Sequence, residues 1–255
     1  MVYKNREFPM LKRLILIALT FLTSLQLHAA TETVHIAHQS NYPPFVYVKN
    51  GRSVGLIVDI LKTAAAKQKI NIQFIPVPFA QVQKALNDGR AEAIVPLAIT
   101  TERQKSYDFS LPLVKTGGAF FVRKSESTPP NLAALSGKIV VTPKTGPYAT
   151  YIEETAPAIN LVITENYEKC FDYIVSGKAD AAALNFQVGK AMINQSYADK
   201  VTIPKKMFAE FPLALAFKKG QNAEILRRLN AGLVTIRADG TLKWLYKKWK
   251  FNPIS

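Results

Sequence analysis

The segment LVITENYEKCFDYIVSGKADAAAL, residues 161–184, decides the fold class because its hydrophobic period changes twice. Alternating apolar residues at its start predict a strand over 161–163. Apolar positions spaced i, i+3, i+4 and i+7 then predict a helix over 167–175 with one buried face, formed by Tyr167, Cys170, Phe171 and Ile174. Residues 179–184 predict a second strand. A strand, a helix and a strand in this order form the repeating unit of α/β proteins.

The same alternation of periods continues towards both ends of the chain. Before the segment, the pattern predicts a strand over 138–142 and a helix over 148–154. An earlier unit repeats this order, with strands over 34–36, 70–74 and 93–95 and helices over 56–67 and 79–87. The tail predicts a strand over 213–217 and helices over 223–238 and 242–249. This tail is too small for a separate domain, so it must return to one of the two units.

An internal similarity links the two units. Gly89-Arg-Ala-Glu-Ala93 and Gly177-Lys-Ala-Asp-Ala181 each follow an amphipathic helix and open a short apolar strand. Either a duplicated unit or a common helix-to-strand connection produces this pattern.

The first 30 residues are typical of a secretory signal peptide. Lys4, Arg6, Lys12 and Arg13 precede the apolar run 14–22, and two alanines follow at 29 and 30. The remaining chain holds 29 Lys and Arg against 17 Asp and Glu, a net charge of +12. Because Cys170 lies far from the expected cleavage site, no N-terminal lipid is predicted. We therefore expect a periplasmic protein that is not a lipoprotein.

Most catalytic and cofactor signatures are missing from the sequence. It has one cysteine and three histidines, and all three histidines lie within the first 40 residues. It shows no glycine-rich phosphate loop and no Cys/His metal spacing. The lysines at 243, 247, 248 and 250 fall on an amphipathic helix, so we interpret them as a solvated face and predict no nucleic-acid partner. No cofactor and no metal are expected.

Several motifs in a fixed order carry a family resemblance. They are Asn41-Tyr-Pro-Pro-Phe45, Gly55-Leu-Ile-Val-Asp-Ile60, Thr100-Thr-Glu-Arg103, Asp108-Phe-Ser110, Gly118-Ala-Phe-Phe-Val-Arg123 and Ala238-Asp-Gly240. Together they resemble the periplasmic solute-binding proteins of amino-acid ABC transporters, bacterial extracellular solute-binding protein family 3. The resemblance covers the whole chain after the signal peptide.

The resemblance implies an α/β fold of the type II periplasmic-binding-protein kind, with two lobes, two hinge crossings and a ligand cleft between the lobes. Lobe 1 would comprise residues 31–118 and 213–255, and lobe 2 would comprise residues 119–212. It also implies a monomer without enzymatic activity, which captures a small carboxylate-bearing solute, an amino acid or a related compound. The partner would be the membrane permease of an ABC transporter.

The resemblance also implies the ligand-binding residues. Arg103 matches the arginine that binds the ligand carboxylate, and Ala98 and Thr100 belong to the same segment. Tyr42 and Phe79 match the aromatic residues that enclose the ligand side chain. Thr145 and Gly146 match the turn before a lobe-two helix, where backbone N–H groups favour an anion. Asn185 and Gln39 match two positions that usually carry an acidic residue. Some of these positions also have a plainer interpretation. It is a surface pair with Glu102 for Arg103, core packing for the aromatic residues and a helix cap for the turn.

Two departures from the family pattern affect the expected ligand. Asn185 replaces the acid that usually contacts the ligand ammonium, and Ala98 replaces a hydroxyl residue. Because a buried ammonium without a carboxylate is costly, the ligand either lacks this group or is held differently. Two other functions remain open, an exported dehydratase that uses the same cleft and a ligand-sensing receptor subunit without a transport role.

Overall fold

The structure, a computed structural model, describes residues 32–144 and 146–252. The predicted signal peptide and Thr145 therefore lie outside the described residues. The described residues from Thr33 onward form one compact body, which contains two α/β units. None of the described helices combines the length and the apolar character needed to cross a bilayer.

The first α/β unit forms as predicted. It consists of β1 (Thr33–Gln39), α2 (Leu56–Ala66), β5 (Asn71–Val77), η1 (Phe79–Gln81), α3 (Val82–Asn87) and β6 (Ala93–Ala98). β1 lies between β5 and β6 and is parallel to both. The helix predicted over 79–87 begins as a 3-10 turn and becomes α-helical at Val82.

The second α/β unit repeats this topology. It consists of β9 (Ile139–Pro143), α5 (Tyr148–Thr155), β10 (Asn160–Thr164), α6 (Tyr167–Val175) and β11 (Ala181–Asn185). β9 lies between β10 and β11 and is parallel to both. The buried residues of α6 are the four that the helical spacing predicts, and Cys170 is fully buried among them.

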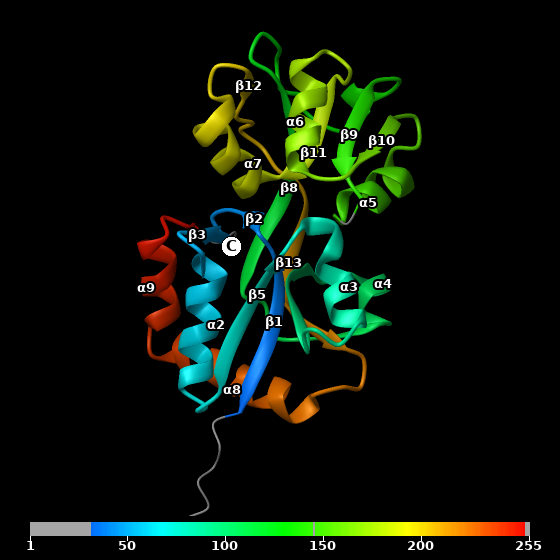
Figure 1. Cartoon of the computed structure of the whole chain (residues 1–255). Helices are drawn as coiled ribbons and strands as arrows, with labels where there is room; N and C mark the ends of the chain where they lie inside the picture. The colour runs from blue at the N-terminus through cyan, green and yellow to red at the C-terminus, as the bar shows by residue number, and fades with distance from the viewer. Residues whose placement is uncertain (1–31, 145, 253–255) are drawn as a thin grey trace, which may run out of the picture. The chain divides into compact units, whose positions relative to one another are not determined.

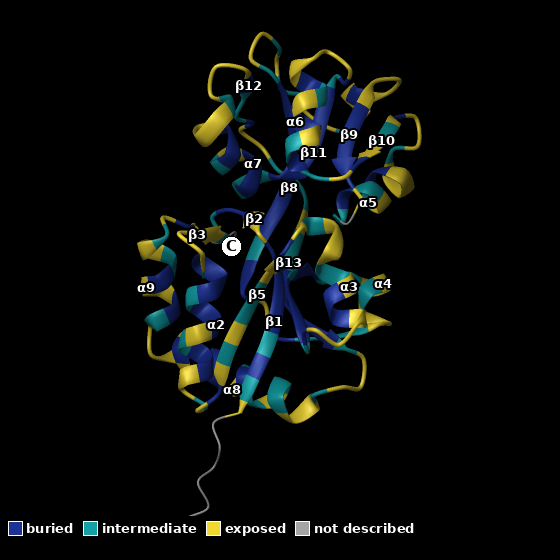
Figure 2. Ribbon diagram, viewed as in Figure 1, coloured by how far each residue is buried: buried dark blue, intermediate teal, exposed yellow. Residues whose placement is uncertain are grey.

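Two long antiparallel strands join the units into one sheet. β8 (Val114–Arg123) pairs with β11 through residues 118–121 and with β13 (Phe208–Lys218) through residues 114–118. β13 also pairs with β6, so the strand order is β10-β9-β11-β8-β13-β6-β1-β5. Figure 1 shows β8 and β13 side by side between the two units. Figure 2 shows that β8 is buried along most of its length.

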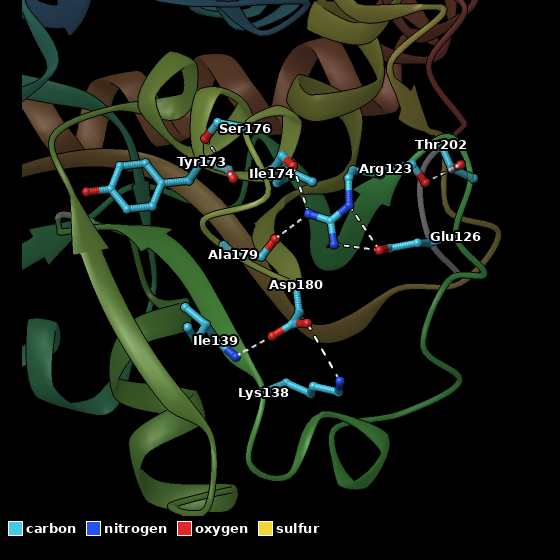
Figure 3. Close-up of polar contacts among 10 residues, drawn as sticks. All are labelled: Arg123, Glu126, Lys138, Ile139, Tyr173, Ile174, Ser176, Ala179, Asp180 and Thr202. Atoms are coloured by element: carbon cyan, nitrogen blue, oxygen red, sulfur yellow. Dashed lines mark hydrogen bonds and ion pairs between the residues drawn. The ribbon is translucent and has the colours of Figure 1, made fainter.

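The similar pentapeptides at Gly89 and Gly177 make matching hydrogen bonds. Both glycines adopt positive φ values, 75° and 74°. The Glu92 carboxylate accepts from His35 N at 2.7 Å, and Glu92 N donates to His35 O. The Asp180 carboxylate accepts from Ile139 N at 2.8 Å, and Asp180 N donates to Ile139 O (Figure 3). The acidic residue thus joins the same two strands in each unit, which favours duplication over a chance connection.

Arg123, at the end of β8, holds the connection between α6 and β11. Its Nη1 donates to the carbonyl oxygens of Ile174 and Ala179 at 2.9 and 2.8 Å (Figure 3). Its Nε donates to Glu126 at 2.9 Å. The guanidinium therefore satisfies one carbonyl group at the end of α6, where helices leave acceptors without partners, and one in the connection to β11.

A small antiparallel sheet beside the first unit is absent from the sequence prediction. It contains β2 (Asn41–Tyr42), β3 (Val46–Lys49) and β4 (Arg52–Val54). Its turn is Asn50-Gly51, with φ values of 51° and 70°. Because an Asn-Gly pair favours a two-residue hairpin turn, this dipeptide is the signal that could have predicted it.

The tail forms α8 (Ala223–Ala238) and α9 (Thr241–Lys248), and both pack against α2 of the first unit. Figure 1 shows α2 and α9 side by side, on the opposite side of the first unit from α3. Six shorter elements of the described residues also lie outside the sequence prediction, α4 (Thr101–Gln104), β7 (Tyr107–Phe109), η2 (Ala133–Leu135), α7 (Phe186–Met192), η3 (Ile193–Tyr197) and β12 (Val201–Thr202).

Asp239 of the Ala238-Asp-Gly240 motif links the end of α2 to the start of α9. Its lowered pKa predicts that the stability of the fold depends on pH. Hydrogen bonds from Thr241 and then Lys67 lower the pKa of Asp239 from 3.8 to about 2. A carboxyl whose pKa falls on folding stabilises the protein above its unfolded pKa, and this contribution is lost as pH falls towards the folded pKa. We expect Asp239→Asn to lower the melting temperature at about pH 6 and to have a much smaller effect near pH 2. An equal effect at both pH values would show that the charge of Asp239 does not contribute.

Candidate functional site

Arg103 and Thr100 lie together at the end of β6, where α4 begins. Thr100 caps α4, and its Oγ1 accepts from Arg103 N at 3.3 Å. The Arg103 side chain turns back along the strand, so that its Nη1 donates to Ala98 O at 3.2 Å. Burial lowers the pKa of Arg103, and Tyr107, Tyr42 and Tyr148 lie close to its guanidinium. Ala98 thus contributes a carbonyl oxygen, and its own side chain is buried.

A cavity of about 600 Å³ lies between α4 and α5. Arg103 and Thr100 form one wall, Gly146 and Thr150 form the other, and Phe211 of β13 also lines it. The ion pair of Glu102 is with Lys105, not with Arg103. The structure therefore places a half-buried guanidinium at a cavity large enough for a small organic molecule.

Three buried tyrosines lie close together near Asn185, and we call them the tyrosine cluster. They are Tyr42, Tyr148 and Tyr167. Tyr42 from β2 packs edge-to-face on Tyr167 from α6, with ring centroids 5.8 Å apart and ring planes at 82°. Tyr167 Oη accepts from Asn185 N at 3.3 Å, and Tyr148 Oη accepts from Asn185 Nδ2 at 3.5 Å. Burial raises the pKa of Tyr42 to about 12, and burial also raises the pKa of Tyr148 and of Tyr167. All three therefore stay neutral hydrogen-bonding groups near Arg103.

Gln39 and Phe79 are brought together at a different place. Both line a small cavity of about 50 Å³ beside β6, which Val95, Pro96 and Leu97 also line. Gln39 is buried and Phe79 is half-buried. Of the nine predicted site residues, Arg103, Thr100 and Gly146 line the large cavity, and Ala98 O binds Arg103. Gln39 and Phe79 line the small cavity, Tyr42 belongs to the tyrosine cluster, and Asn185 hydrogen-bonds that cluster. Thr145 lies outside the described residues.

A family comparison identifies the chain. Residues 34–253 match the family model of bacterial extracellular solute-binding proteins, family 3. The chain belongs to this family. A relative from Bacillus subtilis, "ABC transporter glutamine-binding protein GlnH", is 30% identical over 78% of this chain and 74% of its own length. "ABC transporter arginine-binding protein 1" from Escherichia coli is 25% identical over 94% of this chain and 99% of its own length.

Solved structures agree with the family assignment. "An ancestral arginine-binding protein bound to glutamine" is 29% identical, with a TM-score of 0.76 over 85% of this chain and 97% of that chain. The fold is thus the two-lobed α/β fold of periplasmic binding proteins, as predicted. The named relatives of this family 3 protein are amino-acid-binding proteins of ABC transporters.

Two residues of the tyrosine cluster, Tyr148 and Tyr167, were not predicted as site residues in this solute-binding protein. Tyr167 fits the core face of α6, and Tyr148 opens α5 directly after the Gly146-Pro147 turn. The helical spacing predicts that Tyr167 is buried but says nothing of its hydroxyl group. A buried tyrosine hydroxyl needs a hydrogen-bond partner, which is the signal that could have pointed to this cluster.

Asn185 is fully engaged within the protein. Its Oδ1 accepts from Gln187 N at 3.1 Å and Val188 N at 3.2 Å, so it caps α7. Its Nδ2 donates to Thr116 Oγ1 at 3.2 Å as well as to Tyr148. Each hydrogen-bonding position of the amide thus has a partner. An Asn before an apolar run is also a signal for the start of α7, which the sequence analysis missed.

This arrangement predicts different effects for two substitutions of Asn185. Asn185→Ala removes the cap of α7 and leaves buried polar groups without partners, so we expect a loss of about 2 kcal/mol in the free energy of unfolding. Asn185→Asp keeps the cap, because a carboxylate accepts from the same backbone N–H groups and from both hydroxyl groups. Urea denaturation should therefore show a clearly smaller loss for Asn185→Asp. Equal losses would contradict the capping role.

Proposed function

We propose that this chain is a periplasmic receptor that captures an amino acid, or a closely related carboxylate, and delivers it to the permease of an ABC transporter. The observation that carries the proposal is the half-buried guanidinium of Arg103 at the wall of the cavity between α4 and α5. Its planar fork of donors matches the two oxygens of a carboxylate. Thr100 lies beside it with a hydroxyl group that can add a further hydrogen bond.

The opposite wall supports binding of the same group. Gly146 and Pro147 lie in the cavity wall directly before α5, which starts at Tyr148. The positive end of a helix favours a negative charge. We propose that a ligand carboxylate lies between Arg103 and this end of α5, in contact with both α/β units.

We also propose that the lobes have the limits expected from the sequence, 31–118 with 213–255 and 119–212. The pairing of the long strands supports this division, because β8 pairs with β13 before residue 118 and with β11 after it. Rotation at these two strands would move α5 towards α4. A ligand that contacts both walls then stabilises the closed form, since the open form lacks half of those contacts.

The proposal is a binding function without catalysis, in a monomeric protein that needs no cofactor. The curated relatives named above support this view, because their names describe binding proteins. Export by a signal peptide and delivery to a permease are part of the same proposal. A dehydratase or a sensor would be recognised by product formation or by a signalling partner.

A screen of the twenty standard amino acids by thermal shift tests the proposal. A ligand at 100 times its dissociation constant stabilises the folded state by about 2.7 kcal/mol. We therefore expect at least one amino acid to raise the melting temperature by several degrees, with its concentration unchanged after long incubation. No shift with any amino acid at millimolar concentration would contradict the proposed ligand class, and conversion of the ligand would favour an enzyme.

A further inference from the structure

Two aromatic side chains form a corner in the cavity beyond Arg103. Tyr151 from α5 and Phe211 from β13 both line the cavity, with ring centroids 6.4 Å apart and ring planes at 87°. Both are half-buried. Behind them the rings of Phe120, Tyr148 and Phe208 pack closely, and Phe120 stacks on Phe208 at 4.3 Å. This support makes the corner a rigid surface with ring area available to a ligand.

A negative charge lies next to this corner. Glu154 is three residues after Tyr151 on α5, so it shares a face of the helix with it, and it lines the same cavity. Glu154 is exposed, and it makes no ion pair with any residue that the structure describes. The other acidic residue of the cavity wall, Glu102, is paired with Lys105.

The cavity wall therefore carries a positive charge at Arg103 and a negative charge at Glu154. A ligand carboxylate would neutralise Arg103, and the negative charge of Glu154 would then remain beside Tyr151 and Phe211. Aromatic faces attract cations, and a guanidinium can also stack on them. An acidic side chain would be repelled at this position, and a neutral side chain would gain nothing from the charge.

We infer that the ligand is an amino acid with a cationic side chain, whose charged group lies in the corner of Tyr151 and Phe211 and faces Glu154. This inference rests on the proposed function and names the substrate class of the same site. The positive net charge of the protein opposes a cationic ligand only weakly, because salt screens charges beyond about 8 to 10 Å. The local charge of Glu154 therefore decides which ligand side chain this part of the cavity prefers.

Isothermal titration calorimetry with L-arginine and L-citrulline tests this inference. The two compounds have nearly the same shape, but citrulline carries a neutral urea group in place of the guanidinium. We expect the unmodified protein to bind arginine about tenfold or more tightly, since 1.4 kcal/mol corresponds to a factor of ten. Glu154→Gln should weaken arginine binding about three- to tenfold and leave citrulline binding nearly unchanged.

Glu153→Gln is the matched control. Glu153 is the adjacent residue of α5, it is exposed, and it is not among the described residues that line the cavity. It should leave both affinities unchanged, so a general effect of lost negative charge is separated from a local one. Equal binding of arginine and citrulline, or equal effects of the two substitutions, would overturn the inference.

The outcomes also separate this inference from the proposed function. If the protein binds L-glutamine or another neutral amino acid and ignores arginine, the receptor function stands and the cationic ligand class is wrong. If neither an amino acid nor a related carboxylate binds, the proposed function fails, and the inference fails with it.

Discussion

Replacing Arg103 with alanine is expected to reduce amino-acid binding at least about 30-fold and to leave the fold intact. Truncating one partner of a buried, hydrogen-bonded charge pair costs about 2 to 5 kcal/mol. Arg103 lies at the edge of the first unit, where its side chain turns towards the cavity and Ala98 O. Calorimetry measures the affinity, and circular dichroism checks that the secondary structure and the melting temperature are retained.

Arg227→Ala is the control for this experiment. Arg227 is exposed on α8, where it pairs with Glu224 three residues before it. Removing an exposed ion pair changes stability little, and this pair lies on another element. The control should therefore bind its ligand with unchanged affinity. If Arg103→Ala binds as well as the control, the carboxylate is held elsewhere.

Gly55→Ala is expected to lower the free energy of unfolding by about 3 to 5 kcal/mol and the melting temperature by about 10 °C. Gly55 precedes α2 with a φ of 137°, a conformation that residues with a side chain rarely adopt. A Cβ atom there would lie 2.2 Å from Phe45 O. The backbone cannot easily move away, because Leu56 N and Ile57 N donate to Pro44 O and Phe45 O. Thermal and urea denaturation measure the loss.

Gly51→Ala separates the two causes. Gly51 has a φ of 70° in the hairpin turn, and no atom lies within 4 Å of its Cβ position. Gly51→Ala therefore carries only the cost of placing a side chain at a positive φ, about 1 kcal/mol. Similar losses at both glycines would mean that the close approach of Gly55 to Phe45 contributes little.

The two α/β units were predictable from sequence because each element is long enough to show its period. α8 matches the predicted helix at both ends, and so does α6, whose buried face is the predicted one. The strands of the small sheet have two to four residues, which is too few for a hydrophobic period. β13 was predicted only over 213–217, and the hydrophobic period predicted no strand for β8. The pairing partners of both strands are far away in the sequence.

The candidate site was predictable only where its residues share a segment. Thr100 and Arg103 are three residues apart, and the structure brings them together at the cavity. The family resemblance groups Tyr42 with Phe79, yet Tyr42 belongs to the tyrosine cluster and Phe79 to the small cavity. The ring of Tyr42 packs on Tyr167 of α6, more than a hundred residues later in the chain. Local pattern holds no information on such contacts.

The position of β13 in the sheet has a consequence for the order in which the protein can fold as its chain emerges from the N-terminal end. β6 and β8 emerge early, but the strand between them, β13, begins only at Phe208. While the second unit emerges, one edge of the apolar strand β6 therefore stays without its antiparallel neighbour. An open apolar edge is a template for aggregation. A C-terminal truncation that removes β13 would consequently remove a central strand of the sheet and not an edge strand.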